Sequence, residues 1–265
     1  MFGESIPVSA LSYLTPLFFF KLLLMPPLIG GVTLAARRWG AGVGGWLGGF
    51  PWVAGPISVF LAVEQGPAFA AASTVGALAG SVGTLCFAFV YASVAQRVGW
   101  LPSVLLSYAA YFSVAAGSQY VPLTLPLAFV LNLSALSLIL WKFPRPAVPL
   151  VAAPPPTFDI PLRMAVATLF VVVLTQVAQV LGADWSGLLT PFPILTSTLA
   201  VFTHIQQGPA QSARMVRGIL TAGYGFATFL ALVGYLLPRL GVSLAYGTAI
   251  VVAAVINLAV FRYLR

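Results

Sequence analysis

The chain has 265 residues, of which 60% are hydrophobic and only 6% are charged. This composition excludes an ordinary water-soluble domain, whose surface needs far more charge, and it predicts an integral membrane protein. We interpret the net charge of +8 as a marker of membrane topology, because Lys and Arg are enriched in the cytoplasmic loops of a membrane protein. We expect no nucleic-acid partner.

Apolar runs separated by helix breakers predict an all-α polytopic membrane protein, with one membrane domain over residues 1–265. Proline and glycine set most of the boundaries, since they are common helix start and stop signals. The nine predicted transmembrane helices cover roughly 19–37, 51–65, 69–96, 101–118, 121–141, 162–181, 191–206, 211–237 and 242–262.

Four segments of the chain are irregular. Pro26-Pro27 predicts a kink in the first helix, and the glycine-rich stretch 40–49 is expected to be a connection. Span 51–65 would be only about 22 Å long, short of the ~30 Å hydrocarbon core, so it either crosses thinned bilayer or is re-entrant. Residues 142–160 are rich in proline and predict an extended cytoplasmic linker.

One long stretch of the chain occurs twice, without a gap between the aligned copies. Residues 40–99 and 182–241 are identical at 19 of the 60 aligned positions, including Phe50-Pro51 and Phe192-Pro193. Shared apolar composition does not place the same Phe-Pro pair at the same offset, so we interpret the pattern as an internal duplication. The expected organisation is repeat 1 over 19–122, a connecting helix over 121–141 and repeat 2 over 161–264.

The basic residues indicate how the two repeats are oriented. If all nine spans cross, five crossings separate repeat partners, and the two four-helix repeats are inverted. With the N-terminus outside, only Lys21 and Arg239 of the twelve basic residues then lie outside. If spans 51–65 and 191–206 are re-entrant, the charges split across both sides. The positive-inside rule favours nine crossings. The protein is then expected in the inner membrane, with its N-terminus outside and its C-terminus in the cytoplasm.

The second half carries a further pattern. It consists of Arg163 opening a helix, Gly182-Ala183, the run Ser186–Pro193, His204 in the next helix, and Gly208 at its end. This pattern resembles GlpM-like proteins, which are small bacterial inner-membrane proteins. The first half departs from it, because Ala62 stands where His204 would align. The resemblance implies a fused, inverted pair of four-helix membrane units, and it implies no substrate.

Polar residues gather at the inner end of span 191–206. His204 and Gln207 are three residues apart and therefore share a helix face, and Arg214 and Arg217 follow in the next span. The first repeat has no basic residue at the equivalent positions. The cluster predicts either contact with lipid headgroups or a cytoplasmic gate that recruits anions.

Five further polar residues lie in or near the spans. Thr175, Gln176 and Gln179 share span 162–181, and buried amides in a membrane helix need partners, so they predict helix–helix contact or substrate binding. Glu64 and Lys21 are the ionisable groups of the outer side. They predict either a gate with proton coupling or simple exposure near a span end.

Pro51 and Pro193 are expected to begin two short helices. Free N–H groups and partial positive charge at a helix start suit an anion, and such ends face the substrate in some inverted-repeat transporters. The alternative is that each Phe-Pro pair only anchors and starts its helix. In addition, Gly76 and Gly83 recur as Gly218 and Gly225, which predicts close packing of span 69–96 on span 211–237.

The chain has only four acidic residues and one histidine. No paired carboxylates, zinc-ligand spacing or phosphate-binding loop is visible, so we expect no enzymatic activity, no cofactor and no metal site. Inverted repeats favour a secondary-type transporter that moves a small molecule by alternating access. The alternative is a non-transporting membrane scaffold or an accessory protein of envelope-polymer or lipid handling. The expected partners are the lipid bilayer and a small-molecule substrate.

Overall fold

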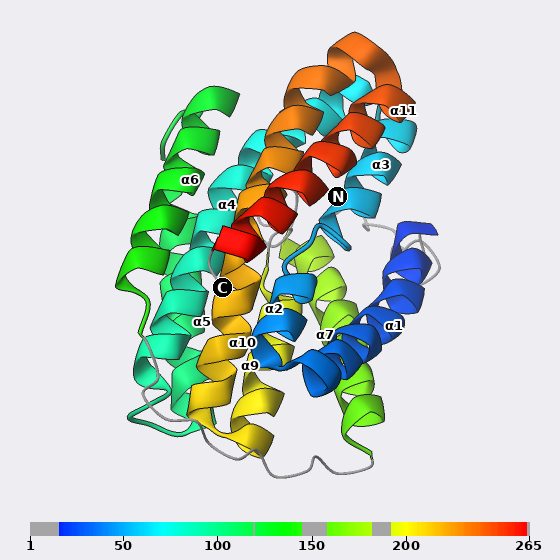
Figure 1. The fold of residues 1–265 in the computed structure, drawn as a ribbon. Helices are drawn as coiled ribbons and strands as arrows, with labels where there is room; N and C mark the ends of the chain where they lie inside the picture. Colours follow the sequence, from blue (N-terminus) through cyan, green and yellow to red (C-terminus); the bar gives the residue numbers. More distant parts are fainter. Residues whose placement is uncertain (1–15, 119, 145–157, 182–191, 264–265) are drawn as a thin grey trace, which may run out of the picture.

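The computed structural model describes residues 16–118, 120–144, 158–181 and 192–263, and every regular element in these ranges is an α-helix (Figure 1). The nine segments predicted as spans are all helical, with α10 and the first part of α11 together forming 211–237. The helices are α1 (Pro16–Trp39), α2 (Ala41–Gly48), α3 (Ala54–Glu64), α4 (Pro67–Val94), α5 (Trp100–Ser118), α6 (Leu125–Lys142), α7 (Asp159–Leu181), α9 (Ile194–Gln207), α10 (Pro209–Thr221) and α11 (Gly223–Tyr263).

Four helical stretches in the described ranges are long and apolar enough to cross a membrane. They are Pro67–Val94, Trp100–Ser118, Leu125–Lys142 and Pro209–Arg262. The last stretch joins α10 to α11, and Gly241 divides α11 with a left-handed φ of 72°. Apolar side chains such as Leu105, Leu138 and Val251 point outward, whereas the polar Asn132 is buried. Apolar surface over buried polar groups indicates a protein that faces lipid.

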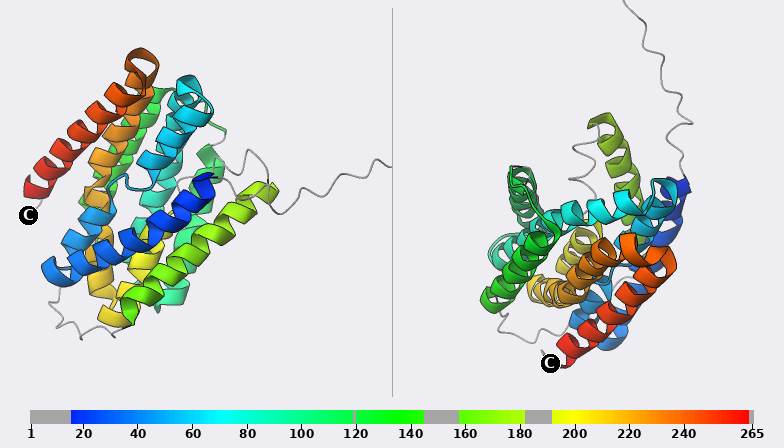
Figure 2. Two further views of the ribbon diagram at one scale, coloured as in Figure 1. Left: turned by 90° about the vertical axis from the view of Figure 1, so that its right-hand side faces the viewer. Right: turned by 90° about the horizontal axis from the view of Figure 1, so that it is seen from above.

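The glycine-rich stretch 40–49 is mostly helical, and its prediction as a connection was wrong. It contains α2, and α2 and α3 follow one another along the bundle, with a break at residues 49–53 (Figures 1 and 2). Close packing explains the glycines, because a Cβ on Gly45 would collide with the backbone carbonyl of Met215 in α10. Tertiary contact therefore overrides the low helix propensity of glycine. The short predicted span 51–65 contains α3, which is the next helix after the short α2 along the chain.

The two Phe-Pro pairs fold alike. The Trp52 amide donates to the Phe50 carbonyl, and in the second repeat the Ile194 amide donates to the Phe192 carbonyl, both at 2.8 Å. The Pro51 and Pro193 carbonyls each accept a hydrogen bond of 2.8 Å from the amide four residues on. Equivalent positions therefore have the same local backbone.

Repeat-equivalent helices lie side by side and run antiparallel. In the α1–α7 pair, a Cβ on Gly30 would lie 3.5 Å from the Met164 sulfur, and Arg37 near the end of α1 contacts Asp159 at the start of α7 (Figure 2). The second pair, α4 with α10 and the first part of α11, is also antiparallel. Buried residues of the first part of α4 cluster with residues 227–237 of α11, and those of its second part cluster with residues 213–220.

Three further expectations are resolved in the described ranges. Helix α1 continues through Pro26-Pro27 as one element. The linker prediction 142–160 was too long at its C-terminal end, because α7 already begins at Asp159, and residues 145–157 lie outside the described ranges. The glycines of α4 and α11 pack elsewhere than expected: Gly83 faces Tyr111 of α5, and Gly225 faces Asn257 in the later part of α11.

Candidate functional site

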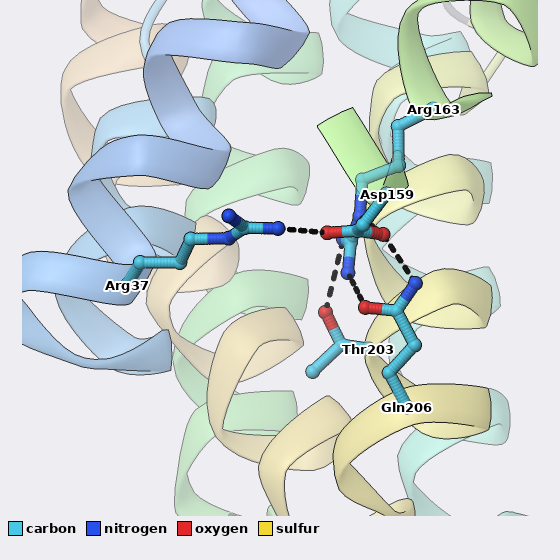
Figure 3. A network of polar contacts seen from close by, with 5 residues as sticks. All are labelled: Arg37, Asp159, Arg163, Thr203 and Gln206. Carbon is cyan, nitrogen blue, oxygen red and sulfur yellow. Dashed lines mark hydrogen bonds and ion pairs between the residues drawn. The ribbon is translucent and has the colours of Figure 1, made fainter. Parts of the chain in front are cut away.

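A cluster of five polar residues lies where α1, α7 and α9 meet (Figure 3): Arg37, Asp159, Arg163, Thr203 and Gln206. Asp159, Arg163 and Thr203 are buried, Gln206 is half-buried, and Arg37 reaches the cluster from the surface. Asp159 accepts hydrogen bonds from Arg163 at 2.7 Å and from Arg37 at 2.8 Å. The side chain of Asp159 is fully buried, and that of Arg163 is 1% exposed. Buried charges are tolerated only when they are paired and hydrogen-bonded. The ion pairs satisfy this requirement and leave the cluster one positive charge in excess.

Helix α9 completes the cluster with residues one turn apart. The Gln206 amide accepts a hydrogen bond from Arg163 at 3.0 Å and donates to Asp159, which closes a three-residue ring. Thr203 lies 3.5 Å from the same guanidinium, which also stands over the Phe202 ring at 5.2 Å from its centroid. The cluster therefore fixes the C-terminal part of α9 against the start of α7.

Sequence reasoning missed this cluster, although one signal was visible. The predicted linker 142–160 includes Asp159 and so hides its spacing of four residues from Arg163, which places both side chains on one helix face. An acidic residue in the first helical turn is also favourable because of the helix dipole. Nothing in the sequence indicates that Gln206 of α9 or Arg37 of α1 reaches the start of α7.

His204 lies on a different face of α9 from Gln206. Its Nδ1 is 3.2 Å from the Tyr91 hydroxyl of α4, and the two rings meet edge to face. Gln207 is half-buried and ends the helix. The C-terminal end of α9 is therefore polar, as predicted. Its residues contact different helices, because His204 contacts α4 and Gln206 contacts α7.

Arg214 and Arg217 line an open pocket of about 360 Å³ between α2, α10 and the ends of α1 and α11. Its walls include Trp39, Gly42, Gly218 and Phe261. His204 is not among the described residues that line it. The structure thus brings the two predicted arginines together and separates them from the His204 contact.

The Phe-Pro pairs sit among aromatic side chains. Phe192 packs against Tyr108, Tyr111 and Phe112 of α5, with ring centroids 5.1–5.8 Å away. Phe50 packs between Trp46 and Trp52. Helix α9 begins directly after the buried Pro193, whereas α3 begins three residues after Pro51. These contacts fit the anchoring interpretation, and anion binding at the two helix starts stays a prediction.

Five predicted residues cannot be placed by their side chains. The backbone positions of Thr175, Gln176 and Gln179 on α7, Lys21 on α1 and Glu64 on α3 are given, but these side chains lie outside the described part of the structure.

In the described ranges, no three His, Cys, Asp or Glu side chains are grouped to hold a metal ion. Comparison of the chain with protein-family models, curated proteins and solved structures finds no match. Function is therefore argued from residues and geometry.

Proposed function

We propose that this protein is a secondary-type transporter that moves a small molecule across the bacterial inner membrane by alternating access. The observation that carries the proposal is the antiparallel pairing of repeat-equivalent helices, α1 with α7 and α4 with α10–α11. Two inverted copies of one unit can exchange their conformations. Such an exchange opens one central site first to one side of the membrane and then to the other.

In the proposed topology all nine predicted spans cross, with the N-terminus outside and the C-terminus in the cytoplasm. Four long apolar stretches and the outward-facing apolar side chains support a membrane location. The consecutive short helices α2 and α3 support transport in particular. Transporters often place substrate sites at such breaks, because unpaired backbone groups there can contact the substrate.

The Asp159 cluster is proposed as the closed inner gate. It joins the two repeats, since Arg37 comes from repeat 1, Asp159 begins α7 just before repeat 2, and the remaining residues come from repeat 2. The Arg37 side chain is 29% exposed, so water can compete for its ion pair. Release of that pair would free α1 from α7 at this end while Asp159 keeps its bond to Arg163.

The repeat offset supports an outer counterpart. The alignment of the two copies relates Lys21 to Arg163, Glu64 to Gln206 and Arg37 to Gln179. The Phe20 and Phe60 rings, with centroids 5.1 Å apart, bring α1 and α3 together in this region. We propose Lys21 and Glu64 as the outer gate, and Thr175, Gln176 and Gln179 as the polar substrate-facing group of α7.

Transport is tested by screening metabolites and charged drugs for thermal stabilisation of the purified protein, followed by uptake of each hit into proteoliposomes. We expect at least one hit to be taken up, and Gln179→Ala to reduce that uptake. The inner gate is tested by joining Gly30→Cys of α1 to Ile160→Cys of α7 in a Cys86→Ala background, because a Cβ on Gly30 would lie 3.7 Å from the Ile160 side chain and the charges of the cluster are kept. Cross-linking should stop uptake, and a reductant should restore it.

One result would contradict transport, and another would contradict only the gate. Stabilising compounds without any uptake would favour the alternative of a scaffold or accessory protein. Uptake that continues after complete cross-linking would leave transport standing and remove the Asp159 cluster as its gate. A single-cysteine Gly30→Cys protein, treated identically, controls for effects of the oxidant.

A further inference from the structure

We infer that the pocket between α2, α10 and the ends of α1 and α11 is a binding site for an organic anion, namely a phosphate or carboxylate group carried on an apolar body. Arg214 and Arg217 supply the charge from one wall. They are three residues apart on α10, so their guanidinium groups extend from the same helix face. Guanidinium binds phosphate and carboxylate oxygens in pairs, which favours anions of this class.

The pocket region is positive beyond these two residues. Arg38 precedes the wall residue Trp39 and stands over its ring at 5.8 Å, and Arg262 follows the wall residue Phe261. The chain has only four acidic residues, and one of them, Asp159, is engaged by Arg37 and Arg163. Clefts lined by charge of one sign concentrate ligands of the opposite sign.

Aromatic walls define the other half of the ligand. Trp39 is 60% exposed and Phe261 is partly exposed, so both can present a flat apolar surface. The volume of about 360 Å³ falls in the range of small-ligand sites. Glycine shapes the remaining wall, because a Cβ on Gly218 would collide with the Gly42 carbonyl and push α2 away from α10.

The repeat provides an internal comparison that separates binding from folding. The positions of Arg214 and Arg217 correspond to Ala72 and Val75 on α4. Helix α4 forms and packs without charge there. The basic pair of α10 is therefore not required for a helix to form and pack at this position of the repeat, and the first repeat supplies the residues for a variant without it.

Calorimetry on the purified protein in phosphatidylcholine nanodiscs tests the inference with three probes: phenyl phosphate, inorganic phosphate and a short-chain phosphatidylglycerol. We expect phenyl phosphate to bind about tenfold more tightly than inorganic phosphate, because its ring buries apolar surface. Arg214→Ala with Arg217→Val, which restores the residues of the first repeat, should weaken phenyl phosphate binding by about tenfold or more. Arg97→Ala with Arg239→Ala removes the same net charge at two exposed sites and should leave binding within about twofold.

Each outcome decides something. Binding of phenyl phosphate without competition by phosphatidylglycerol identifies a soluble anion as the source, and binding of the lipid alone identifies a headgroup. Both results support the site. Absence of binding by both organic probes, or equal binding by the Arg214/Arg217 variant, overturns it. If that variant does not fold, Trp39→Ala replaces it and should abolish the preference for phenyl phosphate over inorganic phosphate, and a retained preference contradicts the inference.

Binding at this pocket is measured without transport, so the two proposals are tested separately. Whether the bound anion is also the transported molecule rests on the proposed transport function. If an unrelated compound is taken up and no anion binds, the anion site is excluded and the proposed transport function still holds.

Discussion

Gly66 and Gly208 are repeat partners and adopt the same backbone conformation, with φ and ψ of 92° and 158° in the first and 86° and 169° in the second. Each is followed by a proline that begins a long helical stretch, and each carbonyl accepts a hydrogen bond of 3.2 Å from the amide four residues on. This conformation is open almost only to glycine. The Gln-Gly-Pro motif therefore contains glycine in both copies because the backbone conformation requires it.

Replacing either glycine by alanine should destabilise the protein. Gly208→Ala and Gly66→Ala each force a Cβ into a positive-φ conformation, which costs about 1–3 kcal/mol. No atom lies within 4 Å of a Cβ at Gly66, so crowding does not contribute there. The measurement is the midpoint of unfolding in detergent micelles. Gly31→Ala is the control, since Gly31 is helical with equally open surroundings, and a loss as large as that of Gly66→Ala would contradict the backbone explanation.

Gly218 and Gly76 are repeat partners with different surroundings. A Cβ on Gly218 would collide with the Gly42 carbonyl and the Trp46 amide, whereas a Cβ on Gly76 meets nothing within 4 Å. We expect Gly218→Ala to lower stability by about 1–3 kcal/mol through overpacking. Gly76→Ala should be neutral or slightly stabilising, because alanine favours a helix. Differential scanning fluorimetry of both variants checks this order, and equal losses would contradict the close α2–α10 packing.

The nine helical segments could be predicted because Gly-Pro and Pro signals bound them and their apolar runs are long. Helix α2 could not be predicted, since five of its eight residues are glycine or alanine and its position depends on close contacts with other helices, such as that of Gly45 with Met215 of α10. A local pattern does not contain a contact between helices from opposite halves of the chain. The same limit applies to Gly83, whose small size serves Tyr111 of α5 rather than α11.

The candidate site shows the same division. Arg214 and Arg217 could be selected as candidates, because charge stands out in an apolar chain and the first repeat lacks it, and their function stays a prediction. The Asp159 cluster could be predicted only in part, through the spacing of Asp159 and Arg163 on one helix. Arg37 reaches it from α1, and that meeting depends on the antiparallel packing of α1 on α7.

Asp159→Asn should be the most destabilising single change in the inner cluster. It removes the only carboxylate of the cluster and leaves the buried Arg163 without a counter-ion, which costs about 3–5 kcal/mol. Arg37→Ala should cost less, because that side chain is partly exposed and Asp159 keeps Arg163. Arg97→Ala, at an exposed position, serves as the control. Chemical unfolding in micelles ranks the three, and a larger loss for Arg37→Ala than for Asp159→Asn would contradict the assigned arrangement.

The proposed inverted arrangement makes a prediction about two residues between the predicted spans. With nine crossings, Asp184 lies outside and Arg145 lies in the cytoplasmic linker, and the opposite repeat orientations require an odd number of crossings between repeat partners. In a Cys86→Ala background, a membrane-impermeant maleimide added to spheroplasts should label Asp184→Cys and leave Arg145→Cys unlabelled. Inside-out vesicles should give the reverse. Labelling of Asp184→Cys from the cytoplasmic side would exclude the nine-crossing topology, and with it the physical basis for exchanging the roles of the two repeats.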